Sequence, residues 1–259
     1  MKVFFIGDII GRPGRIAVKE LLPDIIEKFA IDLVIANGEN AAGGFGITPA
    51  IAEELIGLKI DIITSGNHIW DKKEIIDYIK DKKWLLRPAN YPKATPGFGW
   101  AVAKTRSDAK IAVINLCGRV FMDNLDCPFM AAKEIVKEIE HDTSVIILDM
   151  HAETTSEKAA MGWFLDGKIS AVIGTHTHVQ TADERVLPQG TAFITDAGMT
   201  GSMSSVIGMQ KEIVLERFLT QMPKKFEVAA KDIAMQGVVV SIASETGKAT
   251  AIERINVAL

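Results

Sequence analysis

The sequence predicts an α/β fold with parallel and antiparallel strands. In the first half of the chain, short apolar runs alternate with segments of helical periodicity, an order typical of a parallel sheet covered by helices. Two later segments have the alternation and Gly-containing turns of antiparallel hairpins, which leave room for two stacked sheets instead of one. Apolar residues make up 48% of the 259 residues, enough for a large core, and no repeat or linker divides the chain. We therefore expect a single domain that spans residues 1–259.

The first half is predicted to form three β-α units. Thr48 is the expected N-cap of the second helix, with Pro49 in its first position. Asp71 and Glu74 have the spacing of a capping box at the start of the third helix. Pro23 is expected to kink or break the first helix. The predicted strands and helices alternate over residues 2–7, 14–29, 32–38, 48–58, 61–66 and 71–80.

The second half is predicted to add further strands, two helices and the hairpins. The segment 199–210 is rich in Gly, Ser and Met, and is expected to be either a mobile loop beside the site or a plain connection. The remaining predictions are strands over 98–104, 110–117, 144–150 and 170–174, helices over 128–140 and 155–165, and hairpins over 184–195 and 237–255.

Composition narrows the class of protein. The net charge is −4, and no basic block or basic-aromatic stripe is present, so an extended nucleic-acid surface is not expected. Cys117 and Cys127 match no metal-binding or disulfide pattern. The apolar start is too short for a signal peptide, and no run of 18 apolar residues occurs. These features predict a cytoplasmic protein without a membrane partner.

Polar side chains that can bind metal follow five of the predicted strands. The loops after parallel strands meet at one edge of a sheet, so we expect these side chains to converge. Each one alone has a simpler explanation as a turn former, a helix cap or a hydrogen-bonded histidine, but their coincidence favours a metal site. The residues are Asp8, Glu39, Asn40, Asn67, His68, His151, His176 and His178.

The types of donor atom narrow the choice of metal ion. Carboxylates, carboxamides and imidazoles without a thiolate suit manganese, iron or zinc. His176 and His178 stand two residues apart, so in an extended segment they point the same way and reach neighbouring parts of one cluster. The number of candidate ligands exceeds the needs of one tetrahedral zinc, which favours two metal ions about 3.5–4 Å apart that share a carboxylate and a water.

The order of these motifs, D…E-N…G-N-H…H…G-x-H-x-H, resembles the calcineurin-like metallophosphoesterases. The longer strings "NGENAAGGFGIT", "TSGNHIWDKKEI" and "GTHTHVQTADERVLPQGTAFITDAGMTG" resemble the YmdB-like branch of that superfamily, and the resemblance covers nearly the whole chain. It implies a four-layer α/β/β/α sandwich with mixed sheets and a dinuclear centre, usually of iron or manganese. It also implies a phosphodiesterase, with 2′,3′-cyclic nucleotides as the reported class of substrate.

The resemblance also implies a role for each site residue. His68 matches the residue that donates a proton in catalysis. The ligands of the first metal match Asp8, Asn40 and His178, those of the second match Asn67, His151 and His176, and Glu39 matches the bridging acid.

Two positions depart from the usual superfamily pattern. The common first motif is D-x-H, but Ile10 stands where its histidine would be, so the first metal loses an imidazole that Asn40 is expected to replace. The usual bridging residue is Asp, whereas this chain has Glu39. Both departures match the YmdB-like branch, and they leave the identity of the metals open.

A phosphodiesterase mechanism follows as a hypothesis. A metal-bridging hydroxide would attack phosphorus while His68 protonates the leaving ribose oxygen. Arg12 and Thr154, or the adjacent Thr155, are candidate contacts to the substrate, although a surface or capping role explains Arg12 equally well.

Other functions stay open from the sequence. Barrel-type metal hydrolases of amides also use H-x-H, but on their first strand, where this chain has Asp8. A metal-dependent regulator that binds a nucleotide with little turnover would keep the same ligands and would not need His68. Besides 2′,3′-cyclic nucleotides, 3′,5′-cyclic nucleotides and short RNA are candidate substrates, and self-association as a homo-oligomer is left open.

Overall fold

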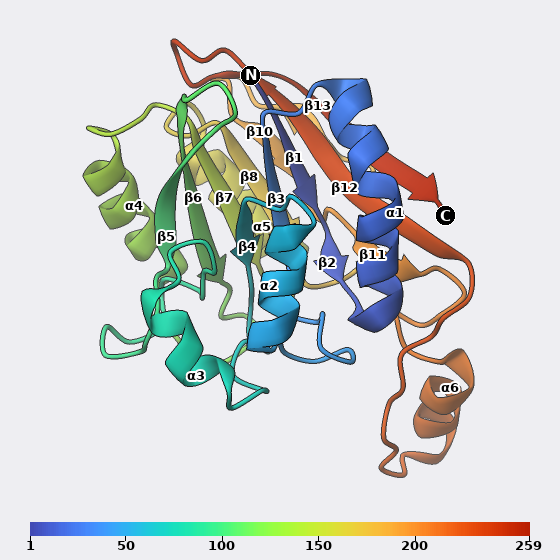
Figure 1. Ribbon diagram of the computed structural model, residues 1–259. Helices are drawn as coiled ribbons and strands as arrows, with labels where there is room; N and C mark the ends of the chain where they lie inside the picture. Colours follow the sequence, from blue (N-terminus) through green and yellow to red (C-terminus); the bar gives the residue numbers. More distant parts are fainter.

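The computed structural model describes residues 1–259 and contains two mixed β-sheets with helices on the outer face of each (Figure 1). In the first, seven-stranded sheet, β1, β3 and β4 are parallel, whereas β12 is antiparallel to β1 and β13. Its strands, in sheet order, are β2 (Asp8–Ile9), β11 (Met199–Ser202), β12 (Ile233–Ile242), β1 (Lys2–Ile6), β3 (Leu33–Asn37) and β4 (Ile62–Thr64), with β13 (Ala249–Ala258) paired to β12.

The second sheet has six strands. Its four inner strands are parallel, and the strand at each edge is antiparallel to its neighbour. In sheet order they are β5 (Trp100–Lys104), β6 (Lys110–Cys117), β7 (Ile146–His151), β8 (Ala171–Thr175), β10 (Ala192–Ile194) and β9 (Arg185–Val186).

The central strands are apolar on both faces because both faces are covered. Successive side chains of a strand point to opposite sides of the sheet. In β1, Val3 and Phe5 pack in the core between the two sheets, whereas Phe4 and Ile6 pack under the helices. Strand β6 divides its side chains in the same way in the second sheet. The predicted four-layer α/β/β/α sandwich is therefore confirmed.

The helices form the two outer layers. Helices α1 and α2 contribute to the core over the first sheet, and α4 and α5 to the core over the second. Helix α6 stands away from the body of the sandwich (Figure 1). No helix combines the length and the apolar character needed to cross a membrane. The helices are α1 (Gly11–Phe29), α2 (Pro49–Gly57), α3 (Ile75–Tyr78) with the 3₁₀ turn η1 (Ile79–Asp81), α4 (Pro128–Ile139), α5 (Thr155–Leu165) and α6 (Lys211–Thr220).

Several local predictions agree with the structure. The hydroxyl of Thr48 caps α2 by accepting the backbone N–H of Ile51 at 3.3 Å, and Pro49 begins that helix. Both predicted hairpins, β9–β10 and β12–β13, are present. Pro23 is an exception: the expected break does not occur, because α1 continues through this residue.

Two local predictions were wrong. The capping box at Asp71 and Glu74 does not form, because α3 begins only at Ile75 and the carboxylate of Asp71 instead bonds the ring of His68. Residues 199–210 were expected to be a loop or a connection along their whole length, but part of this segment is a strand. The first four residues form β11, which is buried and hydrogen-bonded between β2 and β12.

The inter-sheet core should dominate stability. Ile147 is fully buried between the sheets, so we expect Ile147→Ala to lower the free energy of unfolding by about 2–5 kcal/mol. Val257 is 38% exposed on β13, and Val257→Ala should change it by less than about 0.5 kcal/mol. Urea unfolding of both variants measures the difference, and equal effects would contradict this assignment of the core.

Candidate metal centre

The predicted site residues converge at one edge of the sandwich. They lie at or just beyond the carboxyl ends of strands from both sheets, which is where the parallel order of each sheet places them. Asp8 lies two residues after the end of β1 and begins β2, Glu39 and Asn40 follow β3, Asn67 and His68 follow β4, His151 ends β7, and His176 and His178 follow β8.

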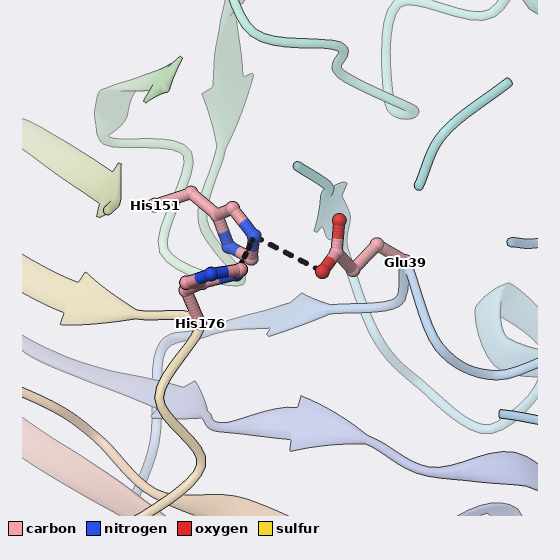
Figure 2. A group of neighbouring side chains, drawn as sticks. All are labelled: Glu39, His151 and His176. Atoms are coloured by element: carbon pink, nitrogen blue, oxygen red, sulfur yellow. Dashed lines mark hydrogen bonds and ion pairs between the residues drawn. The ribbon is translucent and has the colours of Figure 1, made fainter. Parts of the chain in front are cut away.

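One half of the site is centred on the imidazole of His151. Its Nε2 atom lies 3.0 Å from Oε1 of Glu39, 3.1 Å from Oδ1 of Asn67 and 3.0 Å from Nδ1 of His176. Figure 2 shows Glu39, His151 and His176 pointing toward one another, and one potential ligand atom from each of these three lies within 4.8 Å of the others. An imidazole nitrogen carries at most one proton, so these donor atoms cannot all be paired by hydrogen bonds among themselves.

The other half of the site is centred on Asp8. Its Oδ2 atom accepts the backbone N–H of His176 at 3.2 Å, whereas its buried Oδ1 atom has no hydrogen-bond partner and lies 3.6 Å from Nε2 of His178. The carboxamide nitrogen of Asn40 lies 3.3 Å from the same Nε2 atom. A fully buried carboxylate oxygen without a partner is costly, which points to a cation as its missing partner.

Glu39 stands between these two halves. Its Oε1 atom faces His151 and also accepts the carboxamide N–H of Asn40 at 3.3 Å. Its Oε2 atom accepts the backbone N–H of His68 at 3.0 Å. Because Glu39 is fully buried and contacts both donor sets, it is the one carboxylate that can serve both.

A buried network orients His151. Its Nδ1 atom lies 2.9 Å from the hydroxyl of Thr175, which donates to Asp149 at 2.6 Å. Asp149 also accepts from Thr64 and from the carboxamide of Asn37. Burial raises the pKa of Asp149 to about 7 despite these bonds. The network holds the ring with Nε2 toward the site, the arrangement that ligand histidines need.

His176 and His178 occupy an unusual turn rather than the extended segment that we expected. Their φ angles are 95° and 62°, a left-handed region that non-glycine residues rarely adopt. The residue between them is held firmly: Asp196 accepts both the backbone N–H of Thr177 at 3.1 Å and its hydroxyl at 2.5 Å. Asp196 is also paired at 2.9 Å with Lys158, and both side chains are fully buried. The turn therefore brings the two imidazoles to different halves of the site.

A carbonyl contact orients His178. Its Nδ1 atom lies 3.0 Å from the carbonyl oxygen of Ile207, so Nδ1–H donates to that oxygen and leaves Nε2 facing Asp8.

The electrostatics of the site suit cation binding. Burial raises the pKa of Asp8, but the adjacent imidazole of His178 outweighs it and holds the value well below the usual range. Burial lowers the pKa of His178, but Asp8 outweighs it and raises the value to about 9. Burial, together with the neighbouring His151, lowers the pKa of His176 to about 3. At neutral pH, Asp8 is thus an anion and His176 a neutral imidazole, the forms in which both can bind metal. With its pKa of about 9, His178 is protonated as long as no metal is bound, and it has to release this proton to become a ligand.

His68 occupies a different position from the other histidines. Its backbone N–H contacts Glu39, but its half-exposed ring bonds Asp71 through Nδ1 at 2.9 Å and meets the ring of Phe45 edge-on at 5.1 Å. The ring therefore lines the mouth of the site, where it can reach a bound molecule.

The two candidate substrate contacts do not line the cavity of the site. Arg12 is exposed in the first turn of α1, and Thr154 is the N-cap residue of α5. Neither belongs to the cavity of about 370 Å³ that His68, His176 and His178 line. Glu153, which we did not single out, lines this cavity and pairs with His176 at 3.1 Å. The sequence feature that could have identified Glu153 is its position two residues after His151.

The hydroxyl of Thr177 should matter for metal binding. We expect Thr177→Val to weaken manganese binding by about 10- to 100-fold, because the turn loses the hydroxyl bond to Asp196 and keeps only the backbone N–H bond. Thr177→Ser keeps the hydroxyl and should bind manganese as the unmodified protein does. Isothermal titration calorimetry measures both affinities, and equal binding by all three proteins would show that this bond does not position the histidines.

Comparison with known proteins identifies the family of this chain. The family model described as YmdB-like protein matches residues 4–255. The chain is 51% identical over 255 residues to a Bacillus subtilis protein named 2′,3′-cyclic-nucleotide 2′-phosphodiesterase, covering 98% of this chain and 96% of that protein.

Solved structures show the same fold. A hypothetical protein from Thermus thermophilus has 40% identity and a TM-score of 0.93, covering 100% of this chain and 99% of that one. A Mycoplasma pneumoniae phosphatase has 35% identity and a TM-score of 0.93, covering 100% and 93%. The Thermus thermophilus sulfate thiohydrolase SoxB, at 12% identity and a TM-score of 0.55, shares the fold alone. The resemblance seen in the motifs is confirmed, and the chain belongs to the YmdB-like family.

Proposed function

We propose that this protein is a metal-dependent phosphodiesterase that hydrolyses 2′,3′-cyclic nucleotides. The observation that carries the proposal is the pair of donor sets on either side of Glu39, with the ring of His68 at the mouth of the same cavity. The name of the Bacillus subtilis relative supports the class of substrate. The cavity of about 370 Å³ suits a mononucleotide, which favours cyclic nucleotides over longer RNA.

The residues present fit a pair of metal ions. A cation would supply the missing partner of the Oδ1 atom of Asp8. It would also accept the lone pairs of the atoms that surround Nε2 of His151. Oxygen and imidazole donors without a thiolate favour manganese or iron, with zinc as a further option. The first ion would be held by Asp8, Asn40 and His178, the second by Asn67, His151 and His176, and both by Glu39.

The chain's own residues would divide the work of the reaction. When bound, the two cations supply Lewis-acid activation of the phosphoryl group and of the attacking water. His68 would protonate the ribose oxygen that leaves, because its Nε2 atom is the ring nitrogen not engaged by Asp71. Asp71 would fix the tautomer and the orientation of that ring. The second donor set would be held rigid by Asp149 acting through Thr175.

Metal removal should destabilise the protein. Ligands that bind only the folded state stabilise it by about 2.7 kcal/mol at a concentration 100 times the dissociation constant. We therefore expect manganese to raise the melting temperature of chelator-treated protein by several degrees, and Glu39→Gln to abolish most of the rise. Glu27→Gln, an exposed change on α1, is the matched control and should keep it. Differential scanning calorimetry tests this, and the absence of any rise in the unmodified protein would contradict the metal assignment.

The leaving group should reveal the role of His68. We expect His68→Ala to lower kcat for 2′,3′-cyclic AMP by about 10²–10⁴-fold, the usual contribution of a general acid. The loss should be far smaller for bis-nitrophenyl phosphate, because nitrophenolate leaves without a proton.

One control variant completes the experiment on His68. His141→Ala changes the exposed histidine remote from the site and should leave both rates unchanged. An equal loss on both esters in His68→Ala would exclude the role of proton donor. Binding of the cyclic nucleotide without turnover in metal-loaded, unmodified protein would instead favour a nucleotide-binding regulator.

A further inference from the structure

We infer that the apolar end of the cavity binds the nucleobase of the substrate by stacking, chiefly on Phe218 and Phe226. This inference rests on the proposed function and extends it to the part of the substrate that does not react. Apart from the proposed ligand residues and His68, the lining of the cavity is mostly apolar. Beyond Glu39, His68 and the two histidines of the turn, the lining includes Phe45, Val206, Ile207, Met209, Val214, Phe218 and Phe226.

Most of this apolar wall comes from one segment of the chain. Residues 203–230 include α6 and its two flanking stretches, and contribute every one of these apolar side chains except Phe45. In Figure 1, α6 projects from the body of the sandwich. The wall is therefore an addition beside the strand ends and not part of the three cores of the fold.

Neither Phe218 nor Phe226 is fully buried, and Phe218 is the more exposed of the two. Phe218 is 71% exposed although it lines the cavity, so most of its side chain is not packed against other residues and can contact a ligand. Phe226 is half-buried, and the guanidinium of Arg217 lies 4.9 Å from its ring centre. Exposed aromatic rings that line a cavity beside convergent polar groups are typical of ligand sites.

The wall is tied directly to the reacting end of the cavity. The carbonyl oxygen of Ile207 accepts from His178, and the ring of Phe45 contacts that of His68. One cavity is thus lined by four of the proposed ligand residues, by the proposed proton donor and by the aromatic side chains; the four ligand residues are Glu39, Asn40, His176 and His178. A ribose with its cyclic phosphate at the donor atoms would direct its base toward the apolar wall.

The chemistry of the wall favours a base without selecting its identity. Every nucleobase has a flat π face, so stacking on aromatic rings tolerates any base. The seven apolar side chains of the wall offer no hydrogen bond to a base edge. We therefore expect the four 2′,3′-cyclic nucleotides to be hydrolysed with kcat/KM values within about tenfold of one another.

The test compares two substrates on the manganese-loaded protein. One is 2′,3′-cyclic AMP, and the other is methyl riboside 2′,3′-cyclic phosphate, which has the same reacting group but no base. The measured ratio is kcat/KM for 2′,3′-cyclic AMP divided by kcat/KM for the substrate without a base. We expect Phe218→Ala and Phe226→Ala each to lower this ratio by about 5- to 50-fold. Phe218→Trp keeps a stacking surface and should preserve the ratio. Leu219→Ala, on the same helix, 84% exposed and outside the cavity lining, is the matched control.

The outcomes separate the two proposals. An unchanged ratio in both alanine variants, or an equal loss on both substrates, would overturn the base-binding site, and the wall would then serve packing or a protein partner. If the unmodified protein hydrolyses neither cyclic phosphate, the proposed function fails. Calorimetric binding of 2′,3′-cyclic AMP to the same proteins then decides the inference: weaker binding by Phe218→Ala supports it, and unchanged binding overturns it.

Discussion

The site depends on one crowded nitrogen atom. Nε2 of His151 faces an oxygen of Glu39, an oxygen of Asn67 and a nitrogen of His176 at hydrogen-bond distance, in a fully buried position. A single proton cannot satisfy these partners, and an interior of low polarity makes unpaired donor atoms costly. A cation that accepts their lone pairs removes the conflict. The orphaned oxygen of Asp8 sets the same requirement on the other side of Glu39.

The fold meets this requirement with two kinds of support. Parallel strands of both sheets end at the same edge, which brings donors far apart in the chain together. Beneath them, buried polar pairs hold the imidazoles in place: Asp149 acts through Thr175, and Asp196 with Lys158 anchors Thr177. This second anchor allows the left-handed turn that divides the histidines between the two halves of the site. The unusual backbone of His176 and His178 is thus held by the buried contacts of the residue between them.

Much of this could be predicted from the sequence, since it follows from local rules. Strand ends and family motifs are enough to place Asp8, Glu39 and His151 at one edge of the fold. The buried pair that anchors the turn could not be predicted: Lys158 has the pattern of an ordinary helix residue, and its pairing with Asp196 joins positions 38 residues apart. Asp71 was assigned to a helix cap because its spacing to Glu74 fits one, but the ring of His68 competes successfully for its carboxylate. In both cases the partner of the side chain is set by a contact that the local sequence pattern does not indicate.

The most direct test of the metal pair is anomalous diffraction from crystals grown with manganese, recorded at the manganese absorption edge. We predict two anomalous peaks on either side of the Glu39 carboxylate, one contacting Asp8 and His178 and the other contacting His151 and His176. Two-ion centres of this kind have separations of about 3.5–4 Å. A map with no peak beside Glu39, at full manganese loading, would contradict the account.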